Sequence, residues 1–149
     1  MQDRRRPLGA LSILLAAPML VGGIPAEGDV VATVTNLRSS KGQVLACMTA
    51  QPTAFPGCDD DPSARTIIVP AHARVELDFG AVPRGRYAIS IVHDENGNGK
   101  LDKRLMMPRE GYGFSNDAPV RMGPPSFSNA AFDVTESQER LSIRMRYMF

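Results

Sequence analysis

The residues of this chain with the clearest capacity for chemistry lie in one polar segment that begins at Asp94. Asp94, Asn96 and Asn98 stand at alternate positions. Gly99 follows them, and Asp102 ends the series. The spacing D-x-N-x-N-G-x-x-D matches the first nine positions of an EF-hand-type calcium loop, in which alternate side chains converge on one point and a glycine permits the sharp turn. The segment is therefore a candidate calcium site.

The later positions of the pattern define how strong such a site would be. Lys100, in seventh place, would contribute its carbonyl oxygen. In twelfth place Leu105 replaces the bidentate glutamate of a full calcium loop. Glu110, Asp117 or the acidic run 59–61 could complete the shell from elsewhere in the chain. With two carboxylates and two amides in the series itself, we expect weak binding of Ca²⁺, with a dissociation constant of about 10⁻⁴ to 10⁻³ M.

The same residues also suit a turn that binds no metal. Asn96-Gly97 and Asn98-Gly99 are hairpin-turn dipeptides. Asp and Asn side chains also accept hydrogen bonds from nearby backbone N–H groups. The sequence leaves both interpretations open, a calcium loop and a plain turn.

The rest of the chain offers little other chemistry. His72 and His93 are the two histidines, too few for a zinc site once the cysteines are paired, and no Ser–His–Asp order is present. Tyr112 and Phe114 lie among glycines and would either form a stacking surface for a sugar or peptide, or hold the loop down. We therefore expect a non-enzymatic binding or accessory module. The alternatives are a carbohydrate- or peptide-binding module using those two rings, and an unrecognised hydrolase built on the same loop.

The elements that must position this loop are strands. Residues 86–94 are apolar on nearly both faces, which is typical of a central strand. Period-two patterns predict six more strands, at 30–37, 43–50, 65–70, 72–80, 130–135 and 140–148. Seven short strands with turn-rich connections predict a seven-stranded antiparallel β-sandwich of immunoglobulin-like architecture, with a long loop between the fifth and sixth strands.

The two cysteines of the chain are predicted to form a disulfide. Cys47 lies in the second expected strand and Cys58 in the proline-rich loop that follows it. Their spacing is not C-x-x-C, and a pair of cysteines in an exported chain favours a structural bridge. Closing a loop of this length stabilises the fold by about 3 kcal/mol on the chain-entropy model.

The first 26 residues have the features of a secretory signal peptide. Three arginines precede the apolar run 8–24, and small residues follow it at Pro25-Ala26. We therefore expect a signal peptide at 1–26, one domain at 27–149, and a periplasmic or secreted protein with no stable membrane insertion after cleavage. Cleavage changes the formal charge from +1 to −1. A near-neutral domain has little attraction for nucleic acid.

Two motifs in combination resemble a known family. H-D-E-N-G-N-G-K-L-D (93–102) and P-R-E-G-Y-G-F-S-N (108–116) look like an uncharacterised family of exported bacterial proteins, a domain of unknown function. That resemblance implies no catalytic residue and leaves a glycan or another exported protein as the partner to expect. The segment 82–94, with its P-x-G-x-Y turn, is also similar to transthyretin-like and carboxypeptidase-regulatory-like sandwiches, which implies the fold only.

Overall fold

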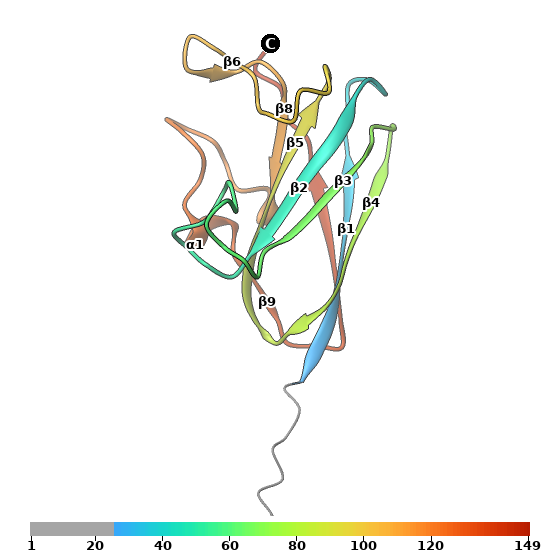
Figure 1. Cartoon of the computed structure of the whole chain (residues 1–149), viewed down its shortest axis with the longest axis vertical. Helices are drawn as coiled ribbons and strands as arrows, with labels where there is room; N and C mark the ends of the chain where they lie inside the picture. The colour runs from blue at the N-terminus through green and yellow to red at the C-terminus, as the bar shows by residue number, and fades with distance from the viewer. Residues whose placement is uncertain (1–25) are drawn as a thin grey trace, which may run out of the picture.

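The fold of the chain is built almost entirely from strands. A computed structural model describes residues 26–149 (Figure 1). Within these residues the strands are β1 (Glu27–Thr35), β2 (Gln43–Thr49), β3 (Arg65–Pro70), β4 (Val75–Pro83), β5 (Gly85–Asp94), β6 (Lys103–Arg104), β7 (Met107–Pro108), β8 (Gly111–Phe114), β9 (Phe132–Val134) and β10 (Gln138–Arg144). Two short helical turns are η1 (Ser115–Asp117) and α1 (Phe127–Ala130). The predicted signal peptide, apart from Ala26, lies outside the described residues.

The strands form two larger sheets and one small hairpin. One sheet has the order β10-β1-β4, and the other has the order β3-β2-β5-β8, with β9 also paired to β5. β6 and β7 pair with each other. Neighbouring strands are antiparallel except β1 and β10, which run parallel and correct the prediction of a wholly antiparallel fold. The reason is the path of the chain: β9 ends beside the start of β5, near the first residues of β1, and a short turn starts β10 there.

The two larger sheets share one hydrophobic core. In β4 the apolar residues Val75, Leu77 and Phe79 are buried while the residues between them are exposed, as the alternation predicted. The same core contains Ile143 of β10 and Ile91 of β5, so both sheets contribute side chains to it. Each fully buried side chain of this size stabilises the fold by about 1.5–3 kcal/mol. This packing fixes the end of β5, from which the candidate loop leaves.

The number of strands differs from the seven predicted. All seven expected segments contain a strand, but β6, β7 and β8 lie inside the segment that was expected to be a loop. β8 has the sequence GYGF, and glycine is disfavoured in strands. Its glycines are explained by close packing: a Cβ on Gly111 would lie 2.3 Å from a ring carbon of Tyr147, and one on Gly113 would lie 3.0 Å from Ile143. The described residues therefore form an all-β structure with ten strands in three sheets.

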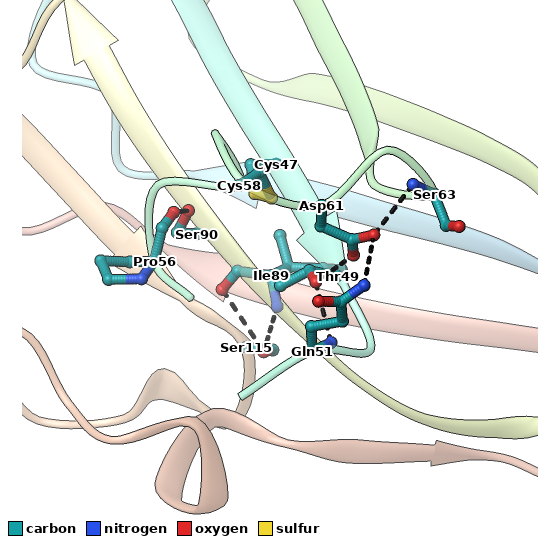
Figure 2. The surroundings of a disulfide bond; sticks show 10 residues. All are labelled: Cys47, Thr49, Gln51, Pro56, Cys58, Asp61, Ser63, Ile89, Ser90 and Ser115. Atoms are coloured by element: carbon teal, nitrogen blue, oxygen red, sulfur yellow. Dashed lines mark hydrogen bonds between the residues drawn. A yellow bond between two sulfur atoms is a disulfide. The ribbon is translucent and has the colours of Figure 1, made fainter. Parts of the chain in front are cut away.

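The predicted disulfide between Cys47 and Cys58 is confirmed (Figure 2). The two Cα atoms are 6.2 Å apart, and the bridge ties the loop after β2 back onto that strand. Inside this loop the buried carboxylate of Asp61 accepts hydrogen bonds from the Thr49 hydroxyl (2.5 Å), the Gln51 amide (3.0 Å) and the backbone N–H of Ser63 (2.8 Å). Asp61 is therefore occupied in ordering its own loop.

Among residues 26–149, no helix is long and apolar enough to span a membrane.

Candidate functional site

The candidate loop begins with a buried carboxylate at the end of β5. Asp94 is 0% exposed, although it is the residue at which the strand gives way to the loop. In the pairing of β2 with β5 it lies opposite Gln43, whose side-chain amide donates a hydrogen bond to Asp94 Oδ2 over 2.8 Å. The sheet therefore fixes the position of this carboxylate before the loop starts.

Asp94 holds the residues that follow it in a tight turn by accepting hydrogen bonds from their backbone. Its Oδ1 accepts hydrogen bonds from the backbone N–H groups of Gly97 (2.8 Å) and Asn98 (3.1 Å). Its Oδ2 accepts one from the N–H of Gly99 (2.8 Å). Gly97 and Gly99 have φ values of 72° and 76°, which glycine adopts without the steric cost that other residues carry. The glycine positions of the motif are thus explained by the turn itself.

Three of the predicted site residues are in contact through their side chains. The Asn96 amide donates to Asp102 Oδ2 over 2.6 Å, and the Asn98 amide donates to Asp102 Oδ1 over 2.9 Å. The oxygen of Asn98 accepts from the backbone N–H of Lys100 over 2.9 Å, while the Lys100 side chain is exposed. Of the five predicted ligands, the structure therefore brings the side chains of Asn96, Asn98 and Asp102 into contact, while Asp94 binds the backbone of the same loop.

Glu110 is the acidic residue that closes the loop. It is 4% exposed, and its two carboxylate oxygens accept hydrogen bonds from the backbone N–H groups of Glu95 (3.0 Å) and Asp102 (3.1 Å). The other acidic groups considered for this position lie elsewhere: Asp117 accepts from the N–H of Arg144, and Asp61 orders the disulfide loop. Glu110 therefore joins the two ends of the loop.

Arg38 holds the outside of the loop, a role that the sequence analysis missed. Its guanidinium pairs with Glu95, with Nε at 3.2 and 3.0 Å from the two carboxylate oxygens. It also lies over the ring of Tyr147, 4.5 Å from the ring centroid, and donates to the carbonyl oxygen of Arg109 over 3.3 Å. No local pattern signals this contact, because Arg38 and Glu95 are far apart in the sequence.

His93 is a structural residue that is hydrogen-bonded within the fold. One ring nitrogen, Nδ1, lies 2.8 Å from the Tyr147 hydroxyl, and Nε2 lies 2.9 Å from the carbonyl oxygen of Lys41. It is fully buried. Both ring nitrogens therefore already have partners within the protein.

The electrostatics of the site keep two of its carboxylates ionised. Burial would raise the pKa of Asp94, but hydrogen bonds from Gln43 and from the backbone at Gly99, Asn98 and Gly97 outweigh it and lower the pKa below its ordinary value. The side-chain hydrogen bond from Arg38 is the largest cause that lowers the pKa of Glu95. These carboxylates are therefore suited to binding hydrogen-bond donors and cations.

A pH titration should reveal the effect of the lowered pKa of Glu95 on the stability of the protein. The pKa of Glu95 in the folded protein lies below its ordinary value of 4.5, so the unfolded chain takes up a proton first as the pH falls. The stabilisation that ionised Glu95 provides is therefore fully present above its ordinary pKa, and it is lost as the pH falls through the pKa of Glu95 in the folded protein. We expect the melting temperature to decrease on acidification below pH 4.5, and to decrease less in Glu95→Gln. Thermal melts over a pH series test this, and an equal decrease in both proteins would contradict it.

Tyr112 and Phe114 do not form an open stacking surface. Their exposed fractions are 6% and 8%, and they belong to a second apolar cluster that also contains Ala88 and Ala130. Phe114 meets the ring of Phe55 edge-on, with the ring centroids 5.9 Å apart. The rings pack within the protein, and this structure gives no support to the sugar- or peptide-stacking alternative.

A small hollow lies beside the loop and contains the groups that could meet an ion. It has a volume of about 230 Å³ and is lined by Arg38, Glu95, Asn96, Asp102, Arg109 and Glu110. Among the described residues, no group of three or more His, Cys, Asp or Glu side chains has an arrangement suited to a metal ion. An ion here would therefore depend on amide and carbonyl oxygens in addition to carboxylates.

Fold and loop together define a class of protein, an all-β domain with an Asp/Asn/Gly loop at the end of a central strand. Residues 32–142 match the family described as "uncharacterized protein conserved in bacteria (DUF2141)", and the chain belongs to this family. The predicted membership of a domain-of-unknown-function family is confirmed. Comparisons with curated proteins and with solved structures gave no match. The likeness to transthyretin-like sandwiches stays a prediction.

Proposed function

We propose that this protein is a non-enzymatic binding or accessory module, exported to the periplasm or secreted, whose 94–102 loop binds calcium weakly. The observation that best supports the calcium site is the contact of Asn96 and Asn98 with the carboxylate of Asp102. Three oxygen-bearing side chains that meet at the end of a fixed strand suit a hard cation, which takes oxygen ligands.

The ligands of this site follow from which oxygens have free acceptor capacity. An ionised carboxylate offers about four lone-pair sites. Asp94 uses them for three backbone N–H groups and the amide of Gln43, so it holds the loop in place and is not itself a ligand. Asp102 meets only side-chain amides through its carboxylate oxygens. The side-chain oxygens of Asn96 and Asn98 each accept one backbone N–H, and each keeps a second lone pair that could face an ion. Asp102, Asn96 and Asn98, with the Lys100 carbonyl, are the ligands that we propose.

The expected affinity is low because the shell carries little negative charge. Asp102 is the charged ligand within the loop, and Leu105 stands where a full calcium loop has its bidentate glutamate. Glu110 lies beside the loop with both oxygens already accepting backbone hydrogen bonds, so its capacity for an ion is partial. We expect a dissociation constant of about 10⁻⁴ to 10⁻³ M, the range of extracellular calcium modules.

The variant Asn96→Asp separates a calcium loop from a plain turn. Without calcium, the new carboxylate faces Asp102 in place of an amide donor that lies 2.6 Å away, so the melting temperature should fall. With calcium, the added charge should strengthen binding, so the calcium-dependent rise in melting temperature should exceed that of the unchanged protein. At a calcium concentration ten times the dissociation constant, the stabilisation is about 1.4 kcal/mol. Thermal melts with calcium and with a chelator measure both effects.

Asn129→Asp is the matched control, because Asn129 is exposed and lies in α1, outside the loop. Its melting temperature should not respond to calcium more than that of the unchanged protein. An Asn96→Asp variant that is destabilised equally with and without calcium would support the plain turn and refute the calcium site.

The non-enzymatic part of the proposal is supported by the charge states of the loop. A hydrolase that used Asp94 or Glu95 as its general acid would need a raised pKa at that carboxyl group. The pKa values of Asp94 and Glu95 are lowered instead. A glycan or another exported protein is the partner class that we propose for the module.

A further inference from the structure

The hairpin of β6 and β7 carries two large apolar side chains at its tip. Leu105 and Met106 join the two strands and are 86% and 91% exposed. Figure 1 shows the hairpin beyond the ends of β5 and β8, at the top of the molecule, on the same end as the last residues of the chain. Of the large hydrophobic residues that are exposed, these two are among the most fully solvated in the described part of the chain.

The backbone at this tip does not explain why these residues are there. Leu105 and Met106 have φ values of 49° and 71°, so both central residues of a two-residue hairpin turn are in the left-handed region. A turn of this kind favours Asn-Gly, because residues with larger side chains are strained there. In an isolated molecule, Leu-Met carries both the cost of the strained backbone and the cost of exposed apolar surface. Such a combination points to a partner that buries the two side chains.

Basic residues surround the apolar tip. Lys103 and Arg104 precede it and Arg109 follows it, while the nearest acidic residues, Asp102 and Glu110, lie at the base of the hairpin. All three basic side chains are exposed, and none of them forms an ion pair within the described residues. Lys100, also exposed, lies just before the hairpin. The partner is therefore expected to carry negative charge next to an apolar layer.

The geometry points to an anionic phospholipid bilayer as this partner. We propose that the hairpin docks on the membrane surface, with Leu105 and Met106 entering the boundary between headgroups and acyl chains. Lys103, Arg104 and Arg109 would then lie at the level of the phosphates. An apolar tip with flanking basic residues meets both parts of such a surface at once, and each basic residue adds to the attraction. This attachment lies in the interface and does not span the bilayer.

The base of the hairpin is held firmly enough to present the tip. The backbone N–H of Arg109 donates to the carbonyl oxygen of Asp102 over 2.8 Å, which closes the hairpin one residue before β6 begins. The N–H of Asp102 is in turn bound by the buried Glu110. Rigid presentation lowers the entropy lost on binding. These contacts need no calcium, so the proposal is independent of the calcium site.

The test is flotation of the chain from Glu27 onward with vesicles, in a chelator so that the result is separate from that of the calcium titration. Vesicles of phosphatidylcholine containing phosphatidylglycerol should carry the protein upward, and pure phosphatidylcholine vesicles should carry much less. Leu105→Asn combined with Met106→Gly should weaken binding by at least about tenfold, because the two apolar side chains are lost. This double variant should melt at the same temperature or higher, since Asn-Gly suits the turn.

Two further variants complete the test. Met122→Asn removes an equally exposed methionine outside the hairpin and should bind vesicles as the unchanged protein does. Lys103→Glu combined with Arg104→Glu should also weaken binding by more than about tenfold, since each basic residue removed costs about fivefold. Equal binding by the Leu105→Asn/Met106→Gly variant would overturn the proposal. So would an unchanged protein that binds neither kind of vesicle, the result expected if the tip serves a protein partner.

Discussion

Replacing Asp94 with alanine is expected to lower the free energy of unfolding by about 3 kcal/mol, because one buried carboxylate accepts four hydrogen bonds. Three of the donors are backbone N–H groups that wind the loop, and the fourth is the side chain of Gln43 in the neighbouring strand. Without Asp94 the three backbone N–H groups and the Gln43 amide lose the acceptor that they share. A domain of this size has a total stability of about 5–15 kcal/mol, so the loss is a large fraction of the whole.

Chemical and thermal denaturation measure this effect, with an expected decrease in melting temperature of about 10 °C. Asp60→Ala is the control, because Asp60 is exposed and lies in the loop between β2 and β3, outside the 94–102 loop. The control should change the free energy of unfolding by less than about 0.5 kcal/mol. If Asp94→Ala were as mild as Asp60→Ala, the hydrogen bonds to Asp94 would not be what holds the loop.

Removing the disulfide is the second change with a large expected effect. Cys47 and Cys58 are 11 residues apart in the sequence, and closing a loop of that length is worth about 3 kcal/mol on the chain-entropy model. The paired variant Cys47→Ala/Cys58→Ala should therefore unfold at a melting temperature about 10 °C lower. The segment between β2 and β3 should also become the first site of proteolysis, because the bridge is what ties it to the sheet.

A reductant provides the matched control for the disulfide. The unchanged protein should lose a similar amount of stability when reduced, and the paired alanine variant should not respond to the reductant. Two further contacts hold the same loop, the Ser90 hydroxyl on the carbonyl oxygen of Pro56 (2.6 Å) and the hydrogen bonds to Asp61. If reduction left both stability and proteolysis unchanged, these contacts and not the bridge would be holding the loop.

The features that were predictable from the sequence are those set by neighbouring residues. Alternation of apolar and polar residues placed β4 and its buried face, because successive side chains of a strand point to opposite sides. The turn around Asp94 was predictable for the same kind of reason, since its acceptors and donors lie within five residues of one another. The pairing of Cys47 with Cys58 followed from the presence of two cysteines and from the expected export of the chain.

The rest required the tertiary structure, because it depends on which distant segments meet. The position of Gln43 opposite Asp94 comes from the register of β2 on β5, and the contact of Glu110 with the loop comes from the path of the chain through the β6–β7 hairpin. The sequence GYGF was expected to lie in a loop. The close packing of Tyr147 against Gly111 explains why a strand at this place contains glycine.

The sequence by itself therefore determined an all-β protein with a disulfide and one Asp/Asn/Gly loop, since hydrophobic alternation, cysteine pairing and Asx turns are short-range effects. Only the tertiary structure decided that Tyr112 and Phe114 are buried and that Leu105 and Met106 are exposed. The physical reason is that burial is a property of surfaces brought together from distant parts of the chain. A local pattern shows that a residue is apolar, but not what covers it.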